Sequence, residues 1–179
     1  MRAHVVGNGA SYIHFKRIEV TDFVLGCNYT YVDANATVII DSRFFRKLTH
    51  KHDPIIIDIP VIINEKCNGW LESKLGKEAK SRINILDVYS PTGKYFPISS
   101  AHVAAIWLIE KQFTEIHIWG CDSLITYDIA SETDKINDSY YKCKENHEAI
   151  TKVVNNWKDK WDLIAKNNPN VNIIFHNEI

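Results

Sequence analysis

A short glycine-containing loop, Gly7-Asn8-Gly9-Ala10-Ser11, follows the first apolar run of the chain. Glycine tolerates positive φ and lets a ligand approach the backbone closely, and Ser11 opens a short helix whose amides can bind an anion. A tight strand-to-helix turn would use the same residues, and the motif alone favours neither reading. It is not the dinucleotide fingerprint, because Tyr12 stands where the third glycine would be, and it is not a Walker A loop.

Polar residues also follow three of the later apolar runs, at Asn28, at Asp41-Ser42 and at Gly120-Cys121-Asp122. The carboxyl ends of parallel strands meet at one edge of a sheet, and ligands bind at that edge. Each group alone is typical of a helix cap or a turn. Together with the glycine loop they favour a ligand site.

Two further features bear on this site. Ser99 and Ser100 precede an Ala-rich helix, where they cap the helix and, in the functional reading, face the ligand with hydroxyls and amides. His147 follows a polar stretch, 123–138, that we interpret as a loop or lid within the range 123–147. That position suits a general acid or base reaching over a site, while the alternative is a histidine on a helix surface.

The other histidine-rich patterns are interpreted as structural. His50-Lys51-His52-Asp53 resembles a metal cluster but is read as a solvated loop, so no metal site is predicted. His117 alternates with apolar neighbours in a strand, which is typical of a hydrogen-bonded core histidine.

Short apolar runs separated by helical patterns predict an alternating α/β domain that positions these residues. The Val- and Ile-rich runs suit strands that are covered on both faces, as in a parallel sheet. We expect strands at 4–6, 23–27, 37–40, 54–63 (one or two strands), 82–88, 115–119 and 171–176, and helices at 42–49, 68–80, 99–113 and 139–167. The predicted fold is a Rossmann-like three-layer domain with a mostly parallel sheet of about seven strands, spanning 1–179 as one domain.

Composition narrows the class of protein. The chain has 179 residues, 45% of them hydrophobic and 24% charged, which is ordinary for a globular protein. A net charge of −1 gives no basic surface for nucleic acid. We expect no secretory leader, and no apolar stretch of the sequence is long enough for a membrane span. The four cysteines form no CxxC pair, so we expect reduced thiols in a cytoplasmic protein.

Taken in order, five segments resemble one superfamily: the loop at 5–11, Phe23-x-x-x-Cys27-Asn28, the segment 41–45, Ser99-Ser100, and Glu115 to Asp122. It contains the bacterial sialyltransferases of glycosyltransferase family 42 and the related pterin pyrophosphokinase-like (DUF115) proteins. Their hallmarks are a Gly-Asn-Gly-Pro-Ser loop after the first strand and a Gly-x-Asp after a late strand. Here Ala10 replaces the proline, Ser123-Leu124 replaces the family's aromatic residues, and the lid is short.

The resemblance implies a nucleotide-activated donor, a CMP-sugar, and no required cofactor or metal. Asn8, Gly9 and Ser11 would contact the donor phosphate or sugar, and Asn28 the phosphate or ribose. Ser99 and Ser100 would contact the transferred sugar, and Gly120, Cys121 and Asp122 the cytidine or its ribose. His147 would be the base that deprotonates the acceptor, and a tyrosine would assist phosphate departure (Tyr95, Tyr127, Tyr140 or Tyr141). Relatives form homo-oligomers, so we expect one here.

Three functions remain open at this point. The first is a small glycosyltransferase that uses a CMP-type sugar nucleotide. The second is a non-catalytic binder that sequesters or senses a nucleotide, which the short lid favours. The third is a pyrophosphokinase-like phosphotransfer enzyme, for which Asp41 and Asp122 are the only strand-end carboxylates available to hold magnesium.

Overall fold

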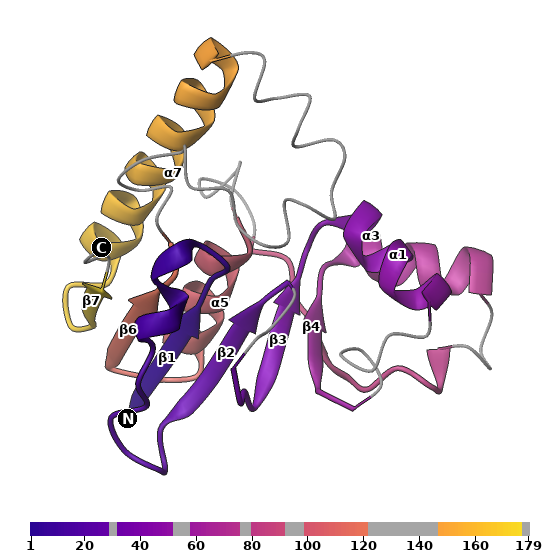
Figure 1. The fold of residues 1–179 in the computed structure, drawn as a ribbon, viewed down its shortest axis with the longest axis horizontal. Coiled ribbons are helices and arrows are strands. Elements are labelled where there is room, and N and C mark those ends of the chain that lie inside the picture. Colours follow the sequence, from indigo (N-terminus) through magenta and orange to yellow (C-terminus); the bar gives the residue numbers. More distant parts are fainter. Residues whose placement is uncertain (29–31, 52–57, 76–79, 92–98, 122–146, 177–179) are drawn as a thin grey trace.

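The computed structural model describes residues 1–28, 32–51, 58–75, 80–91, 99–121 and 147–176. Strands and helices alternate along the chain (Figure 1). In order they are β1 Arg2–Val6, the 3-10 helix η1 Ala10–His14, β2 Phe23–Cys27, β3 Ala36–Ile39, α1 Ser42–Lys51, β4 Val61–Ile63, α3 Glu65–Trp70, the π-helical turn η2 Leu71–Leu75, β5 Ile85–Val88, α5 Ser100–Glu110, β6 Glu115–Trp119, α7 His147–Asn167 and β7 Asn172–His176.

The strands form one seven-stranded sheet in the order β5-β4-β3-β2-β1-β6-β7. Every strand pair within the described residues is parallel. Parallel strands need crossover connections that cover both faces of the sheet, which is why their sequences read as near-continuous Val and Ile runs. The predicted α/β class and the sheet of about seven strands are therefore confirmed.

The order of the strands creates one reversal. From β1 the chain adds β2, β3, β4 and β5 successively in one direction, and then β6 pairs with the opposite side of β1. In open α/β sheets, ligands bind outside the carboxyl ends of the strands at such a switch point. The fold thus singles out the carboxyl ends of β1 and β6 before any side chain is considered.

Alternate residues of each strand enter cores on opposite faces of the sheet, because successive side chains in a strand point to opposite sides. One face packs under α5 and α7, with Val5, Leu25 and Ile118 from the strands and Leu108 and Ile164 from the helices. The other face packs under α1 and α3 on one half of the sheet and under η1 on the other half. These three layers are the Rossmann-like arrangement that the sequence predicts.

The predicted helix at 68–80 begins earlier than the sequence indicates. We expected it to start at Asn68, whereas α3 starts at Glu65 and continues into η2. The side chain of Asn64 accepts a hydrogen bond from the backbone N–H of Cys67 at 2.9 Å, so Asn64 is the N-cap. Glu65 adds an acidic group to the first turn, where it complements the helix dipole.

No helix in the described part of the chain is long and apolar enough to cross a membrane. The three described cysteines, Cys27, Cys67 and Cys121, are buried free thiols, in line with the expectation of reduced cysteines.

Candidate functional site at the carboxyl edge of the sheet

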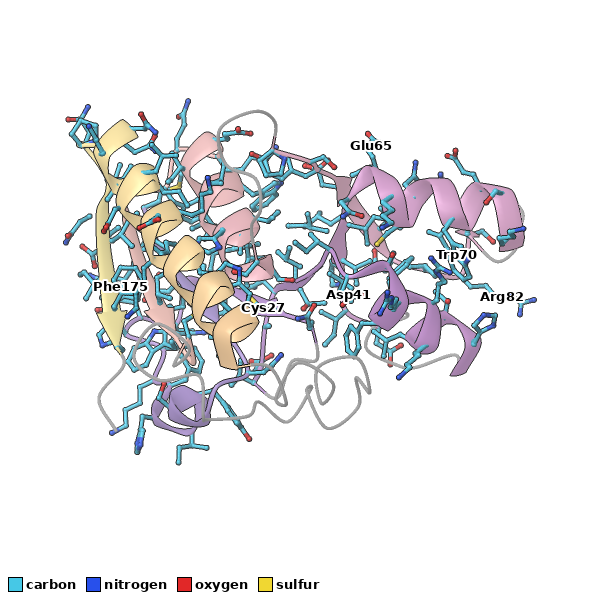
Figure 2. The ribbon with its side chains drawn as sticks, turned by 90° about the horizontal axis from the view of Figure 1, so that it is seen from above. Cys27, Asp41, Glu65, Trp70, Arg82 and Phe175 are labelled. Atoms are coloured by element: carbon cyan, nitrogen blue, oxygen red, sulfur yellow. The ribbon has the colours of Figure 1, made fainter. Side chains whose placement is uncertain are left out.

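Strand register aligns the ends of the central strands in one row. Val6 of β1 pairs with Gly26 of β2 on one side and with Trp119 of β6 on the other, and Trp119 pairs with His176 of β7. The next residues along β1 and β6 are Gly7 and Gly120. Figure 2 looks onto this carboxyl edge from above and places Cys27 and Asp41 near its middle, between the α7 half and the α1–α3 half of the molecule.

The loops after β1 and β6 pack directly against each other through two glycines. The N–H of Gly7 donates to the carbonyl of Trp119 at 2.7 Å, and that of Gly9 donates to the carbonyl of Gly120 at 2.8 Å. A Cβ on Gly7 would overlap the Gly120 carbonyl, and a Cβ on Gly120 would lie 2.6 Å from the Gly7 carbonyl oxygen. Gly120 also has a φ of 63°, in the left-handed region.

This packing bears on the prediction that the amides of the glycine loop bind an anion. The amides of Gly7 and Gly9 donate to the carbonyls of Trp119, the last residue of β6, and of Gly120, the residue after it, so they hold the two loops together and are not aimed at a ligand. The absence of side chains at Gly7 and Gly120 follows from the close approach of the two backbones. The structure places Gly7, Gly9 and Gly120 at the switch point but assigns these three residues a scaffolding part.

Asn8 ties the β1 loop to the end of β2. Its side-chain nitrogen donates to the carbonyl oxygen of Cys27 at 2.6 Å, and the side chain is largely buried. The neighbouring Ser11, in η1, is also buried. A buried amide that is hydrogen-bonded to backbone fixes the position of the loop relative to the strand.

Asn28 and Ser100 join β2 to the start of α5. The hydroxyl of Ser100 donates to the side-chain oxygen of Asn28 at 3.1 Å, across 72 positions of the chain. Asn28 has a φ of 57°, which asparagine tolerates better than most residues, and strained backbone of this kind is frequent at functional sites. The hydroxyl of Thr37 donates to the backbone carbonyl oxygen of Asn28 at 3.1 Å and supports this conformation. Asn8, Asn28 and Ser100 therefore form a polar set from three elements at one edge.

Ser99 is the N-cap of α5. Its side chain accepts a hydrogen bond from the backbone of His102, and Nδ1 of His102 in turn accepts one from the backbone N–H of Ser99 at 3.0 Å, which completes a capping box. On the other side of the ring, Nε2 of His102 donates to the carbonyl of Trp157 in α7 at 3.0 Å. Burial lowers the pKa of His102 to about 4. Ser99 thus has the capping role that the sequence offered as one of its two readings.

Asp41 and Ser42 mark the start of α1. The carboxylate of Asp41 accepts hydrogen bonds from the backbone N–H groups of Arg43 at 2.8 Å and Phe44 at 3.2 Å, so it caps that helix. Ser42 is buried in the first turn. Both lie at the end of β3, two strands from the β1–β6 switch point.

Asn64 also lies at the carboxyl edge of the sheet, and the sequence analysis does not predict it. Besides capping α3, its side-chain nitrogen donates to the carbonyl of Ile40, after β3, at 3.0 Å. This bond resembles the one from the side chain of Asn8 to the carbonyl of Cys27, which joins the β1 loop to the end of β2. The signal was present as an asparagine directly after the apolar run Val61–Ile63 and before a helical pattern.

Cys27 and Cys121 are buried at the same edge. Burial raises the pKa of Cys27 well above its ordinary value, and the nearby thiol of Cys121 raises it further. A thiol held protonated in this way is a poor nucleophile, because the thiolate is the reactive form. Cys121, one of the predicted site residues, is buried in the core cluster that lies under α5 and α7.

Several predicted site residues lie wholly or partly outside the described residues. They include Asp122, the lid and the tyrosines Tyr95, Tyr127, Tyr140 and Tyr141. His147 is the first residue of α7, which starts on the carboxyl side of the sheet and runs back beside β7 (Figure 1). The described residues contain no group of three or more His, Cys, Asp or Glu side chains arranged to hold a metal ion.

No protein-family model, curated protein or solved structure matches this chain.

Proposed function

We propose that this protein binds a nucleotide-type ligand, a sugar activated as its CMP derivative, over the carboxyl ends of β1, β2 and β6. The observation that carries the proposal is the coincidence of the switch point with the polar set Asn8, Asn28 and Ser100. Sheets of this class bind ligands at that position, and polar side chains that converge there from separate elements are the usual source of specificity.

The hydrogen-bonding capacity of Asn28 and Ser100 suits the polar part of such a ligand. A serine hydroxyl both donates and accepts, and an asparagine carries two donors on its nitrogen. Asn28 is only partly buried, so a ribose hydroxyl or a phosphate oxygen can approach it. Asn8, which is buried against Cys27, acts in this scheme by fixing the loop and not by contacting the ligand.

Asp41 argues against phosphotransfer. A magnesium-dependent enzyme would use strand-end carboxylates to hold the metal. The carboxylate of Asp41 accepts two backbone N–H groups at the start of α1, two strands away from the switch point. Transfer from a sugar nucleotide does not need such a metal when side chains stabilise the leaving phosphate.

Thermal-shift or calorimetric titration with CMP, UDP, ADP and cyclic nucleotides, with and without magnesium, tests the ligand class. We expect CMP to bind without magnesium. A response to ADP that requires magnesium would favour phosphotransfer, and a response to cyclic nucleotides alone would favour a sensing protein. If none of these nucleotides binds, the proposed function is wrong. Release of CMP from a CMP-sugar then distinguishes a transferase from a binder.

Ser100→Ala is expected to weaken CMP binding about tenfold, which corresponds to the loss of one hydrogen bond to the ligand or its positioning partner. Asn28→Gly should have a similar effect, because glycine keeps the φ of 57° and removes only the side chain. The matched control is Ser73→Ala, an exposed serine that bonds to the carbonyl of Trp70 in its own helical segment. Equal affinities for all these chains would exclude the Asn28–Ser100 pair from the site.

A further inference from the structure

The two outer strands of the sheet, β5 and β7, differ in how well they are protected against pairing with a further strand. An outer strand presents a row of backbone N–H and C=O groups, and proteins protect such edges with charged side chains, prolines or bulges. β5 has two of these features. Its register against β4 skips Leu86, which forms a bulge, and Asp87 places a carboxylate in the strand.

β7 has none of these protective features. Its five residues, Asn-Ile-Ile-Phe-His, include no proline and no Lys, Arg, Asp or Glu. Its register against β6 runs without a shift, and within the described part of the chain no strand pairs with its other side. Figure 2 shows Phe175 at the outer margin of the molecule, and 39% of this residue is exposed. β7 is therefore an open sheet edge among the described residues.

The backbone of β7 turns two residues outward. The N–H of Asn172 donates to the carbonyl of Thr114, next to β6, at 2.9 Å. Successive residues of a strand direct their backbone groups to opposite sides, so Asn172 and the residues two and four positions later face β6. Ile173 and Phe175 direct their N–H and C=O groups away from the sheet. The edge thus offers donors and acceptors at the spacing that another strand uses.

The outward residues lie symmetrically about Ile174, which makes β7 complementary to itself. When a second copy is placed antiparallel about a two-fold axis at Ile174, Ile173 lies opposite Phe175 of that copy and exchanges backbone hydrogen bonds with it. Asn172 lies opposite His176 of the second copy, an amide beside an imidazole. Apolar side chains therefore meet apolar ones, polar meet polar, and no two like-charged Lys, Arg, Asp or Glu side chains are opposed.

The side chains on the helix side of β7 gain cover from this pairing. Ile173 packs partly buried against the core under α5 and α7. Phe175 contacts Trp161 of α7 edge-on, with ring centroids 5.1 Å apart, and leaves part of its surface exposed. Aromatic and β-branched residues that lie opposite each other on neighbouring strands stabilise the pairing. Ile173 of the second copy and Phe175 form such a pair.

We propose that two copies of this chain associate through β7, antiparallel about a two-fold axis at Ile174, so that the sheet continues from one copy into the other. A foreign strand would use the same backbone groups, but the matching of Asn172 with His176 and of Ile173 with Phe175 is a property of two copies of β7. The strands of the two copies run in opposite directions. Their carboxyl edges therefore open on opposite sides of the shared sheet, and each copy keeps its own candidate site.

The mass of the protein in solution tests the association. Sedimentation velocity and light scattering are measured over about 1–100 μM protein, where small interfaces dissociate. We expect the parent chain to form a dimer whose fraction rises with concentration. Phe175→Lys should raise the dissociation constant about tenfold or more, because it places a charge on the paired edge and removes the contact with Ile173. The matched control is Leu86→Lys on β5, an equally exposed position (47%), which should dimerise like the parent.

A parent chain that stays monomeric over this range would overturn the proposal, and so would a Phe175→Lys chain that dimerises as strongly as the parent. Circular dichroism and urea unfolding show whether each variant is folded, because Phe175 also contacts Trp161. If Phe175→Lys does not fold, the following cross-linking experiment decides the question.

Ile174 is the residue that meets its own counterpart in this register. The Cα atoms of such a non-hydrogen-bonded antiparallel pair lie about 4.5 Å apart, within the range of about 4.4–6.8 Å that a disulfide spans. We expect Ile174→Cys to give a covalent dimer on mild oxidation, seen on a non-reducing gel. All chains carry Cys143→Ser, since the three described cysteines are buried. Leu86→Cys is the control and should stay monomeric on the gel. No covalent dimer from Ile174→Cys, or as much from Leu86→Cys, would refute the pairing of β7 with its own copy.

Discussion

Gly7→Ala is expected to destabilise the protein by about 1–3 kcal/mol, the range typical of overpacking. The added Cβ would overlap the carbonyl oxygen of Gly120, and the carbonyl carbon lies 3.0 Å away. The obstructing atoms are backbone atoms that are held by hydrogen bonds between the two loops, so neither side can move without losing the bonds from Gly7 or Gly9. The β1 loop and the β6 loop would have to separate.

Gly69→Ala provides the matched control. Gly69 lies inside α3, and a Cβ there meets nothing within 4 Å. Alanine in a helix interior is more stable than glycine by about 0.5–1 kcal/mol, so this variant should gain stability. Urea unfolding monitored by circular dichroism measures both changes. A Gly7→Ala chain as stable as the parent would show that the two loops do not approach as closely as described.

Lowering the pH from about 6.5 to 4 is expected to remove about 3 kcal/mol of stability through His102 alone. Burial lowers the pKa of His102 from an ordinary value of 6.5 to about 4 in the folded chain. Between these values the unfolded chain binds more protons than the folded chain, so stability rises with pH in this window. Above about 6.5 both states are neutral and the loss disappears; below about 4 both are protonated and no further loss arises from this group.

His102→Gln removes this dependence while keeping the capping bond that the neutral ring makes with Ser99. Glutamine is the residue that a capping box uses at this position, so its side chain can accept from the N–H of Ser99. We expect the plot of unfolding free energy against pH to flatten between 6.5 and 4 in this variant. His50→Gln, an exposed histidine, should follow the parent. Parallel curves for His102→Gln and the parent would contradict a buried neutral His102.

The sequence predicts those features that depend on local pattern. Apolar runs such as Glu115–Trp119 mark the strands, and Ser99 marks the start of α5, because strand periodicity and capping act over a few residues. The helical pattern predicts a start at Asn68, whereas Asn64 caps α3 and Glu65 begins it. The gathering of Asn8, Asn28 and Ser100 at one edge was also expected, since parallel strands end together.

Other features depend on which strands are neighbours, and local pattern does not contain that information. Taken alone, the loop Gly7–Ser11 is typical of an anion-binding site. Because β6 lies beside β1, the carbonyls of Trp119 and Gly120 accept the hydrogen bonds of the Gly7 and Gly9 amides. In the sequence, His117 is typical of a core histidine. Its hydrogen bond with His176 forms because β7 pairs with β6. The strand order β1-β6-β7 brings together residues that are far apart in the chain, so a short stretch of sequence cannot predict it. The resemblance to the sialyltransferase superfamily stays a prediction.

The central place of β1 has a consequence for the order of folding. β1 is formed by the first residues of the chain, yet its second neighbour is β6, and Arg2 meets Glu115 across 113 positions. Pairing β1 with β6 is slow, because the long segment between them loses conformational entropy before the contact forms. The half-sheet from β1 to β5 can assemble during synthesis, with one side of β1 unpaired and open to association with other chains until β6 docks. A chaperone that shields the open side of β1 is expected to raise the refolding yield of this protein, and a chain ending before β6 is expected to aggregate.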